Sequence, residues 1–254
     1  MKLICEGRCG RGVVRQSNQD NLFINGKWRT DLSFHEVVSF TDVAEQGIYA
    51  ACDGMGGESF GEEASLIAAQ SLVGVLPEAF FHSGPEYLTA MNRDICRLMR
   101  QRGARIGTTF VGLAVAEKQA RVINIGDSRA YLLRGGQMKK LSRDHTQTQR
   151  LMDMGFITPE QAATHPDRHK LTQHLGIFPE EMIIEPYQSD MFALRRGDLF
   201  LLCSDGLTDM LTEQEIALML CGNLRTAEKA ERLYRGAVLR GGRDNITVVL
   251  IQVV

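Results

Sequence analysis

Acidic side chains recur where strand-like runs end. The run "GIYAACDG" (47–54) stops at Asp53, and the run "GDLFLLCSDGL" (197–207) reaches Asp205 in the same way. Comparable strand ends or turns carry three further aspartates, namely Asp20, Asp127 and Asp244. One such residue alone is usually a turn or cap residue. Together they indicate a shared site, and converging carboxylates repel one another unless a cation lies among them.

The kind of cation follows from the donor set. Carboxylates and carbonyls without a His/Cys set favour Mn²⁺ or Mg²⁺ over Zn²⁺. Gly54 would let a backbone carbonyl approach such an ion closely. The loop does not have the spacing of a phosphate-binding loop: no Lys follows Gly57, and Ser59 stands where a dinucleotide fingerprint needs glycine.

The elements that position these residues are mainly hairpins. The segments 107–126 and 130–142 each predict two strands, which turn at 117–119 and at Gly135-Gly136. Consecutive hairpins indicate antiparallel sheets rather than alternating βαβ units. Helical periodicity is present in four segments: 62–76, 85–102, 212–222 and 225–242. We therefore expect an α+β fold, a four-layer α/β/β/α sandwich in which pairs of antiparallel helices flank two antiparallel sheets.

Residues 143–185 interrupt this succession of predicted strands. The segment is polar and contains four of the six histidines, including His165, His169 and His174. We interpret it as an insertion beside the sheets within one domain, 1–254. The spacing of the three histidines is loosely compatible with a metal site, but Pro166 opposes the single helical face that such a site would need. The sequence therefore does not predict a metal site there.

Bulk properties exclude several classes of protein. A net charge of −2 over 254 residues gives no reason to expect nucleic acid or an anionic membrane as partner. The longest strongly apolar run, 246–254, is far shorter than the ~20 residues of a membrane span. Six cysteines without a recognisable leader favour reduced thiols and a cytoplasmic location.

A series of motifs stands in order along the chain: "RQSNQDN" (15–21), "CDGMGG" (52–57), "GTTFV" (107–111), "INIGDSRAYLLR" (123–134), "LSRDHT" (141–146), "HPDRHKLTQHLG" (165–176), "LLCSDGLTD" (201–209) and "GGRDNITVV" (241–249). These motifs resemble those of the PPM-type (type 2C) metal-dependent protein serine/threonine phosphatases, in their compact bacterial form. The resemblance covers essentially the whole chain.

The resemblance implies a role for each candidate residue. Asp53 would bridge two Mn²⁺ or Mg²⁺ ions, with the Gly54 carbonyl on one of them. Asp205 and Asp244 would bind the other ion, while Asp20 would act on an ion or its water. The resemblance also places Asp127 on a third, weaker ion that it shares with Asp205. A metal-bound water or hydroxide would then attack phosphoserine or phosphothreonine directly.

Arg15 resembles the arginine that binds the substrate phosphate. A planar guanidinium can bind two oxygens of a doubly charged phosphate, which suits this role better than lysine would. A surface salt bridge is the alternative, but Arg15 lies five residues before Asp20, which favours the site. Arg15, Asp53 and Asp205 are therefore the predicted catalytic residues.

Two positions depart from the family pattern. Met55 stands where eukaryotic members have the histidine often taken as general acid, a change that bacterial members commonly share. Gln19 stands where many members have glutamate, which removes one charge beside the ions. Residues 143–185 resemble the family's flap, which shapes substrate access.

The partners implied are phosphorylated proteins, including a bacterial Ser/Thr kinase, and the protein is expected to be a monomer. Two alternatives stay open. One is a non-catalytic regulator that binds phosphoproteins, which the intact set Asp53, Asp205 and Asp244 opposes. The other is a phosphatase of anti-sigma-factor antagonists, which usually carries sensory domains and a different motif set.

Overall fold

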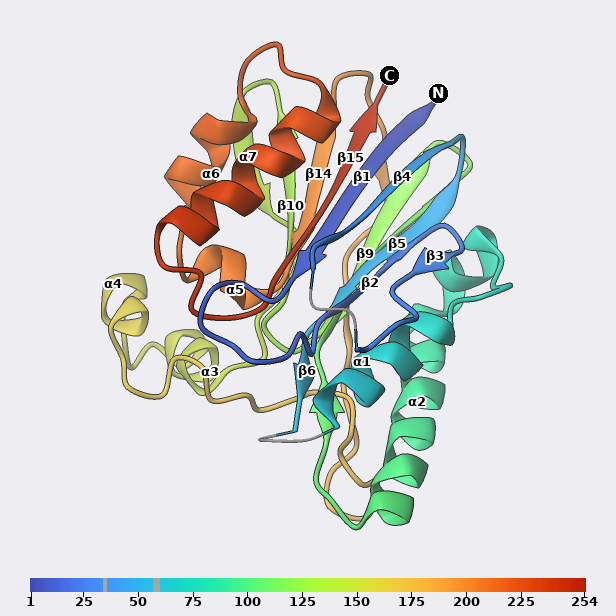
Figure 1. Cartoon of the computed structure of the whole chain (residues 1–254), viewed down its shortest axis with the longest axis vertical. Helices are drawn as coiled ribbons and strands as arrows, with labels where there is room; N and C mark the ends of the chain where they lie inside the picture. Colours follow the sequence, from blue (N-terminus) through green and yellow to red (C-terminus); the bar gives the residue numbers. More distant parts are fainter. Residues whose placement is uncertain (34–35, 57–59) are drawn as a thin grey trace.

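Two antiparallel sheets pack face to face and helices cover both outer surfaces (Figure 1). The computed structural model describes residues 1–33, 36–56 and 60–254. Gly57 and Ser59 of the glycine-rich loop lie outside the described residues. The expected α/β/β/α sandwich is confirmed.

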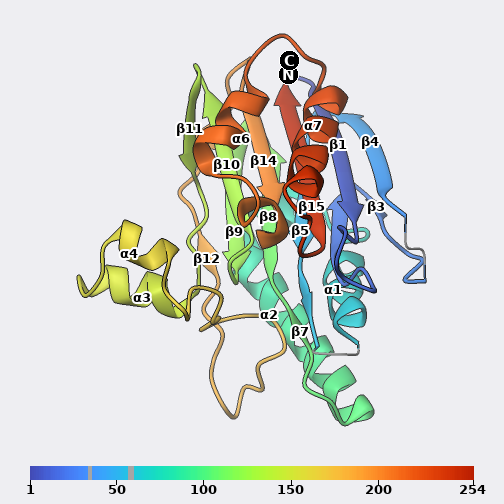
Figure 2. The ribbon, with the colours of Figure 1, turned by 60° about the vertical axis from the view of Figure 1, so that its left-hand side comes forward.

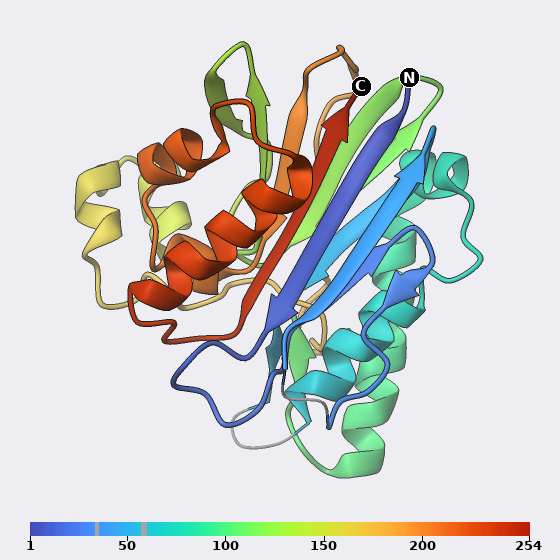
Figure 3. The same ribbon diagram turned by 45° about the horizontal axis from the view of Figure 1, so that its top comes forward.

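The first sheet has the order β11-β10-β14-β15-β1-β4, with every neighbouring pair antiparallel. In that order the bounds are Gln137–Lys140, Arg129–Arg134, Leu199–Cys203, Ile246–Val253, Leu3–Gly10 and Val38–Ala44. Figure 3 shows β1 and β15 side by side at its centre.

The second sheet has the order β12-β9-β8-β5-β2-β3, and β13 also pairs with β9. In that order the bounds are Tyr187–Gln188, Gln119–Ile125, Phe110–Ala116, Gly47–Cys52, Asn21–Ile24 and Lys27–Trp28, with Phe192–Ala193 for β13. A two-stranded ribbon of β6 (Gly54–Met55) and β7 (Gly107–Thr108) extends below it.

Helices α1 (Gly61–Gln70) and α2 (Pro77–Arg102) cover the second sheet. The first sheet is covered by α6 (Glu213–Leu220) and α7 (Thr226–Leu239), beside the one-turn helix α5 (Asp205–Thr208). The capping box at Thr212 and Glu215 is present at the start of α6, as its sequence predicts.

Strand β5 shows how the sequence divides its side chains between two apolar layers. Ile48 and Ala50 pack toward α1 and α2, whereas Tyr49 and Ala51 pack between the sheets. This period of two is the ordinary alternation of a strand, and both of its faces are buried here. A strand that is fixed on both faces holds the residue at its end, Asp53, in a defined place.

Both predicted hairpins are present. The first turns at Glu117 and Lys118, which have φ of 50° and 62°, and the second at Gly135 and Gly136, with φ of 58° and 80°. Positive φ at both central residues matches the right-handed twist of the strands.

The two N-terminal helix predictions were wrong at their bounds. The helix expected over 62–76 ends at Gln70. The helix expected over 85–102 extends back to Pro77, because the chain passes through a kink at Ser83 (φ −122°) just before Pro85. Proline lacks the N–H of a helix interior and disfavours helical geometry before it, so its position resembles a helix start in sequence.

Residues 143–185 contribute no strand to either sheet. They form α3 (Gln147–Asp153) and α4 (Pro159–Ala163), which stand to one side of the sandwich (Figure 2). Isolated bridges tie the segment to itself at Thr146–Leu171 and to the second sheet's ribbon at Thr108–Leu175. Among the described residues, no helix is both long and apolar enough to cross a lipid bilayer.

The layer between the sheets should dominate stability. Ile251 is fully buried there, so Ile251→Ala should lower the free energy of unfolding by about 2–5 kcal/mol. Leu218→Ala, on a side chain of α6 that is 71% exposed, should change it by less than about 0.5 kcal/mol. Urea unfolding followed by fluorescence measures both, and equal losses would contradict this assignment of the core.

Candidate metal centre

Four of the predicted aspartates meet at one end of the sandwich. Asp53 follows β5, Asp127 lies between β9 and β10, Asp205 follows β14 and Asp244 precedes β15. All four line one open cleft of about 920 Å³, together with Arg15, Gly54 and Met55. The strands come from both sheets, so the cleft lies where the two layers end.

Close backbone packing fixes two pairs of these elements. A Cβ at Gly206 would lie 1.9 Å from the Asn245 carbonyl oxygen, so the first turn of α5 packs directly on the loop that carries Asp244. A Cβ at Gly126, where φ is 97°, would lie 2.6 Å from Thr109 Cγ2. Only glycine permits these approaches, and they place Asp205 beside Asp244 and Asp127 beside the Asp53 strand.

Asp53 is held at its backbone and leaves its carboxylate to the cleft. Its N–H donates to Thr109 Oγ1 at 3.1 Å. Its carbonyl accepts from Thr109 N and from Thr108 Oγ1, both at 2.9 Å. These bonds fix the backbone at the end of β5, so the Asp53 carboxylate has a defined position at the cleft.

Gly54 lies in a very tight backbone crossing. A Cβ there would lie 2.3 Å from the Gly61 carbonyl oxygen and 2.4 Å from the Gln19 carbonyl oxygen. A side chain at this position would therefore push the N-terminus of α1 away from the loop. The glycine keeps the main chain of 53–54 against the floor of the cleft.

Burial and the crowding of like charges raise the pKa values of these carboxyl groups. Burial, followed by neighbouring aspartates, raises the pKa of Asp53 and of Asp127 well above the ordinary value. Burial and then Asp209 and Asp244 raise the pKa of Asp205 to about 6. Among the described residues the buried Oδ1 of Asp205 has no hydrogen-bond partner. An oxygen donor set with an unsatisfied buried oxygen fits hard divalent cations.

Asp20 does not line the cleft but lies fully buried beneath it. Its Oδ2 accepts hydrogen bonds from Ser204 Oγ and Thr247 Oγ1, both at 2.7 Å, and its Oδ1 has no partner in the described chain. Burial raises the pKa of Asp20 to about 7. This position fits an indirect action on the ions better than a direct contact with substrate.

A buried arginine holds the backbone of the loop that carries Asp20. Arg29 is 2% exposed, and its Nη1 donates to the carbonyl oxygens of Asn18 and Asp20, both at 2.9 Å. Sequence reasoning did not identify Arg29, because its role depends on backbone carbonyls and not on a motif.

Arg15 extends over the cleft with 55% of its side chain exposed. Its Nη2 lies 2.5 Å from Asp244 Oδ2, and that hydrogen bond raises the pKa of the guanidinium. The structure thus places Arg15, the predicted phosphate-binding residue, at the cleft. There it is hydrogen-bonded to Asp244, a predicted metal ligand.

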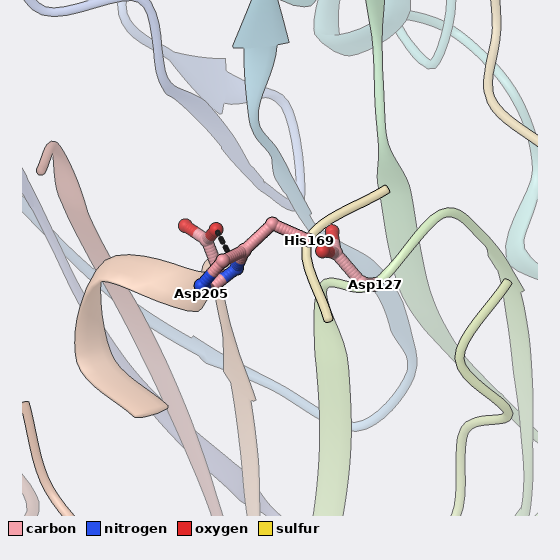
Figure 4. Close-up of side chains that lie close together, drawn as sticks. All are labelled: Asp127, His169 and Asp205. Atoms are coloured by element: carbon pink, nitrogen blue, oxygen red, sulfur yellow. Dashed lines mark ion pairs between the residues drawn. The ribbon is translucent and has the colours of Figure 1, made fainter. Parts of the chain in front are cut away.

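Two residues that the sequence did not assign also reach the cleft. The imidazole of His169 lies 3.9 Å from Asp205 Oδ2 through Nδ1 and 3.5 Å from Asp209 Oδ2 through Nε2. Figure 4 shows this ring between Asp127 and Asp205. No local spacing could have revealed the contact, because it depends on how residues 143–185 fold back.

The chain is similar to several known proteins. The family described as protein phosphatase 2C matches residues 25–237. The protein phosphatase PhpP of Streptococcus pneumoniae is 35% identical, and the alignment covers 94% of this chain and 93% of PhpP. The crystal structure of the Mycobacterium tuberculosis serine/threonine phosphatase PstP/Ppp has 32% identity and a TM-score of 0.83, covering 100% of this chain and 99% of that one. A catalytic domain of PstP solved with two manganese ions has 30% identity and a TM-score of 0.78, covering both chains fully.

The raised pKa of Asp20 predicts a pH dependence of stability in metal-free protein. In the folded state the Asp20 carboxyl group keeps its proton up to a pH of about 7, whereas an unfolded aspartate loses its proton at about pH 3.9. The stabilisation is therefore complete below about pH 4 and is lost as pH rises through about 7. As pH rises from about 4 to about 7, the free energy of unfolding of Asp20→Asn should increase relative to that of the original chain.

Thermal unfolding in EDTA at several pH values, compared between the two proteins, measures this difference. Excess Mn²⁺ should raise the melting temperature of the original chain most at the higher pH. A difference between the proteins that is independent of pH would contradict the assignment.

Gly54→Ala should damage the centre without unfolding the chain. The added Cβ must displace the Gly61 or Gln19 backbone, which moves the floor of the cleft. We expect weaker Mn²⁺ binding by about tenfold or more, measured by calorimetric titration, with a circular dichroism spectrum like that of the original. Unchanged Mn²⁺ affinity would show that the tight crossing is not needed.

Proposed function

The chain belongs to the protein phosphatase 2C family, and from this we propose that its acidic cleft is the catalytic site. The protein is a metal-dependent serine/threonine protein phosphatase that uses Mn²⁺ or Mg²⁺ and acts on phosphorylated proteins. The observation that carries the catalytic assignment is the meeting of four strand-end aspartates in one cleft with Arg15.

In the proposed centre Asp53, the Gly54 carbonyl, Asp205 and Asp244 would hold two ions, and Asp127 would hold a third together with Asp205. Asp20 would act from beneath on an ion or its water. When bound, the ions would lower the pKa of a water and neutralise charge on the phosphate.

Arg15 then binds the phosphate. Its guanidinium is exposed, and its partner Asp244 is itself a proposed ligand. By turning from Asp244 toward the substrate, Arg15 would donate two hydrogen bonds to phosphate oxygens. Met55 lines the cleft but has no ionisable proton, so it cannot act as the general acid, and a water at the site would protonate the departing Ser or Thr oxygen in its place.

The surroundings of the cleft support wider proposals. We propose a single domain, 1–254, in which residues 143–185 act as a flap, since α3 and α4 line a second cleft of about 750 Å³ that shares Asp127, His169 and Asp205 with the main cleft. Free cysteines, five of them buried, suit a reducing cytoplasm. The proposed physiological role is that of a monomer that reverses the work of a Ser/Thr kinase.

Removing one central carboxylate tests the catalytic assignment. Asp53→Asn and Asp205→Asn should each lower Mn²⁺-dependent kcat on p-nitrophenyl phosphate and on a phosphothreonine peptide by at least about 10³-fold. Asp94→Asn, on an exposed carboxylate of α2, is the matched control and should keep full activity. Full turnover in either variant or in excess EDTA would reject the proposed centre. A complete lack of turnover in the original chain would favour the non-catalytic regulator.

Substitution of Arg15 separates binding from chemistry. Arg15→Lys keeps a charge but loses the planar fork, so kcat/KM for the peptide should fall by about 10-fold, and Arg15→Ala should lower it by about 100-fold. Mn²⁺ affinity should rise or stay constant, because Asp244 loses a competing partner. Steady-state kinetics and metal titration check both expectations, and weaker Mn²⁺ binding would place Arg15 in a supporting role instead.

A further inference from the structure

We propose that Asn245 is a positioning residue for the proposed reaction, one that acts through Arg15. Its buried amide fastens the loop 11–19 to the loop that carries Asp244, and this joint sets where Arg15 meets the substrate phosphate. The inference rests on the proposed function and extends it. The contacts that define the role of Asn245 are with residues at least 226 positions away along the chain.

The first sheet brings the two loops together. Gly10, the last residue of β1, pairs with Ile246, the first residue of β15. Residues 11–19 therefore leave the sheet beside the loop that carries Asp244, and close backbone packing keeps them there. A Cβ at Gly12, where φ is 75°, would lie 2.2 Å from the Asp244 carbonyl oxygen. Only glycine permits this approach.

The side-chain amide of Asn245 joins the two loops with three hydrogen bonds. Its Oδ1 accepts from Gln19 N at 2.7 Å. Its Nδ2 donates to the carbonyl oxygens of Arg11 at 3.1 Å and Ser17 at 2.9 Å. Both N–H groups of the amide are thus used, and a reversed amide would set its oxygen against two carbonyl oxygens. Asn245 borders the cleft but is only 5% exposed, so its amide is engaged with the chain and is not available to substrate.

These bonds hold the chain on both sides of Arg15. The Asn245 amide binds the loop four residues before Arg15 and again two residues after it. Between these points, Val13 N and Val14 N donate to the Gly242 carbonyl oxygen at 2.8 and 3.3 Å. The Arg15 side chain itself is 55% exposed. An exposed arginine side chain has many rotamers open to it, so its placement on a phosphate depends on how firmly its backbone is held.

Arg29 supports the far end of this loop independently of Asn245. Its Nη1 donates to the carbonyl oxygens of Asn18 and Asp20. Loss of the Asn245 amide would therefore free the part of the loop that carries Arg15, while Asp20 stays in place. A displacement of about 1 Å at a group that positions substrate can lower the rate by about 100-fold.

A double-mutant cycle with Arg15 tests the proposal. Asn245→Ala should lower kcat/KM for a phosphothreonine peptide by about 10-fold, mainly through a rise in KM, because Arg15 no longer meets the phosphate in a fixed position. In an Arg15→Ala chain the same substitution should lower kcat/KM by less than about 2-fold, because the group through which Asn245 acts is already absent. Mn²⁺ affinity, measured by calorimetric titration, should change by less than about 3-fold, since Asn245 is not proposed to orient a metal ligand.

Asn92→Ala is the matched control. Asn92 is 3% exposed, and its amide also makes three hydrogen bonds to backbone groups, with Gly176 N at 2.7 Å, Ile177 N at 3.1 Å and the Ile177 carbonyl oxygen at 2.8 Å. Truncation removes the same number of bonds at either asparagine, so both variants should lower the melting temperature. Any effect of Asn92→Ala on kcat/KM should be equal in the original and the Arg15→Ala chains. Asn245→Ser, which keeps one polar group, takes the place of Asn245→Ala in the cycle if the latter does not fold.

Hydrogen exchange of the metal-free protein gives a measurement that needs no turnover. In EDTA, the backbone amides of residues 11–19 should exchange at least about 10-fold faster in Asn245→Ala, because Gln19 N loses its acceptor and the loop loses two further bonds. Exchange in β14 should stay as in the original chain, which reports that the sheet is still folded. Asn92→Ala should leave the exchange of residues 11–19 unchanged.

Three results would overturn the proposal. The first is an equal loss of kcat/KM from Asn245→Ala in the original and the Arg15→Ala chains, and the second is unchanged exchange of residues 11–19. The third is a loss of Mn²⁺ affinity of about 10-fold or more, because Asn245 would then act on a metal ligand. Absence of turnover in the original chain would reject the proposed function, whereas faster exchange of residues 11–19 in Asn245→Ala would still support the joint.

Discussion

Like charges held close together at the end of two sheets are the constraint on which the site depends. Asp53, Asp127 and Asp205 are brought together by strands that are buried on both sides, and burial raises the pKa of each carboxyl group. Ionising such groups without a cation costs free energy, so the stability of the apolar layers offsets a strain that the proposed metal ions would relieve. In the proposed centre the same cations would also attract a dianionic phosphate.

Much of the fold could be predicted from sequence, because its signals are local. Turn residues such as Gly135-Gly136 identify the hairpins, and the capping box at Thr212 identifies the start of α6. Where a local signal is ambiguous the prediction was wrong: Pro85 resembles a helix start although α2 passes through it with a kink. Strand ends could be recognised as such, so the aspartates there could be proposed together.

The remaining parts of the site depend on contacts between distant segments. Arg29 acts on the backbone carbonyls of a loop, and His169 reaches the cleft only because residues 143–185 fold back beside it. Neither contact produces a residue spacing that can be recognised in the sequence. The burial of Asp20 likewise depends on hydroxyl groups of Ser204 and Thr247, which are near in space but far along the chain.

The central pairing of β1 with β15 also has a consequence for how the enzyme is made. Residues 2 and 254 are joined by two backbone hydrogen bonds at the end of the sandwich opposite the cleft. Asp244 precedes β15, so neither the middle of the first sheet nor this carboxylate is in place until β15 has paired with β1. Pairing over such a sequence distance is intrinsically slow. The acidic cleft is therefore assembled late in folding, after residues from both ends of the 3–253 segment have met.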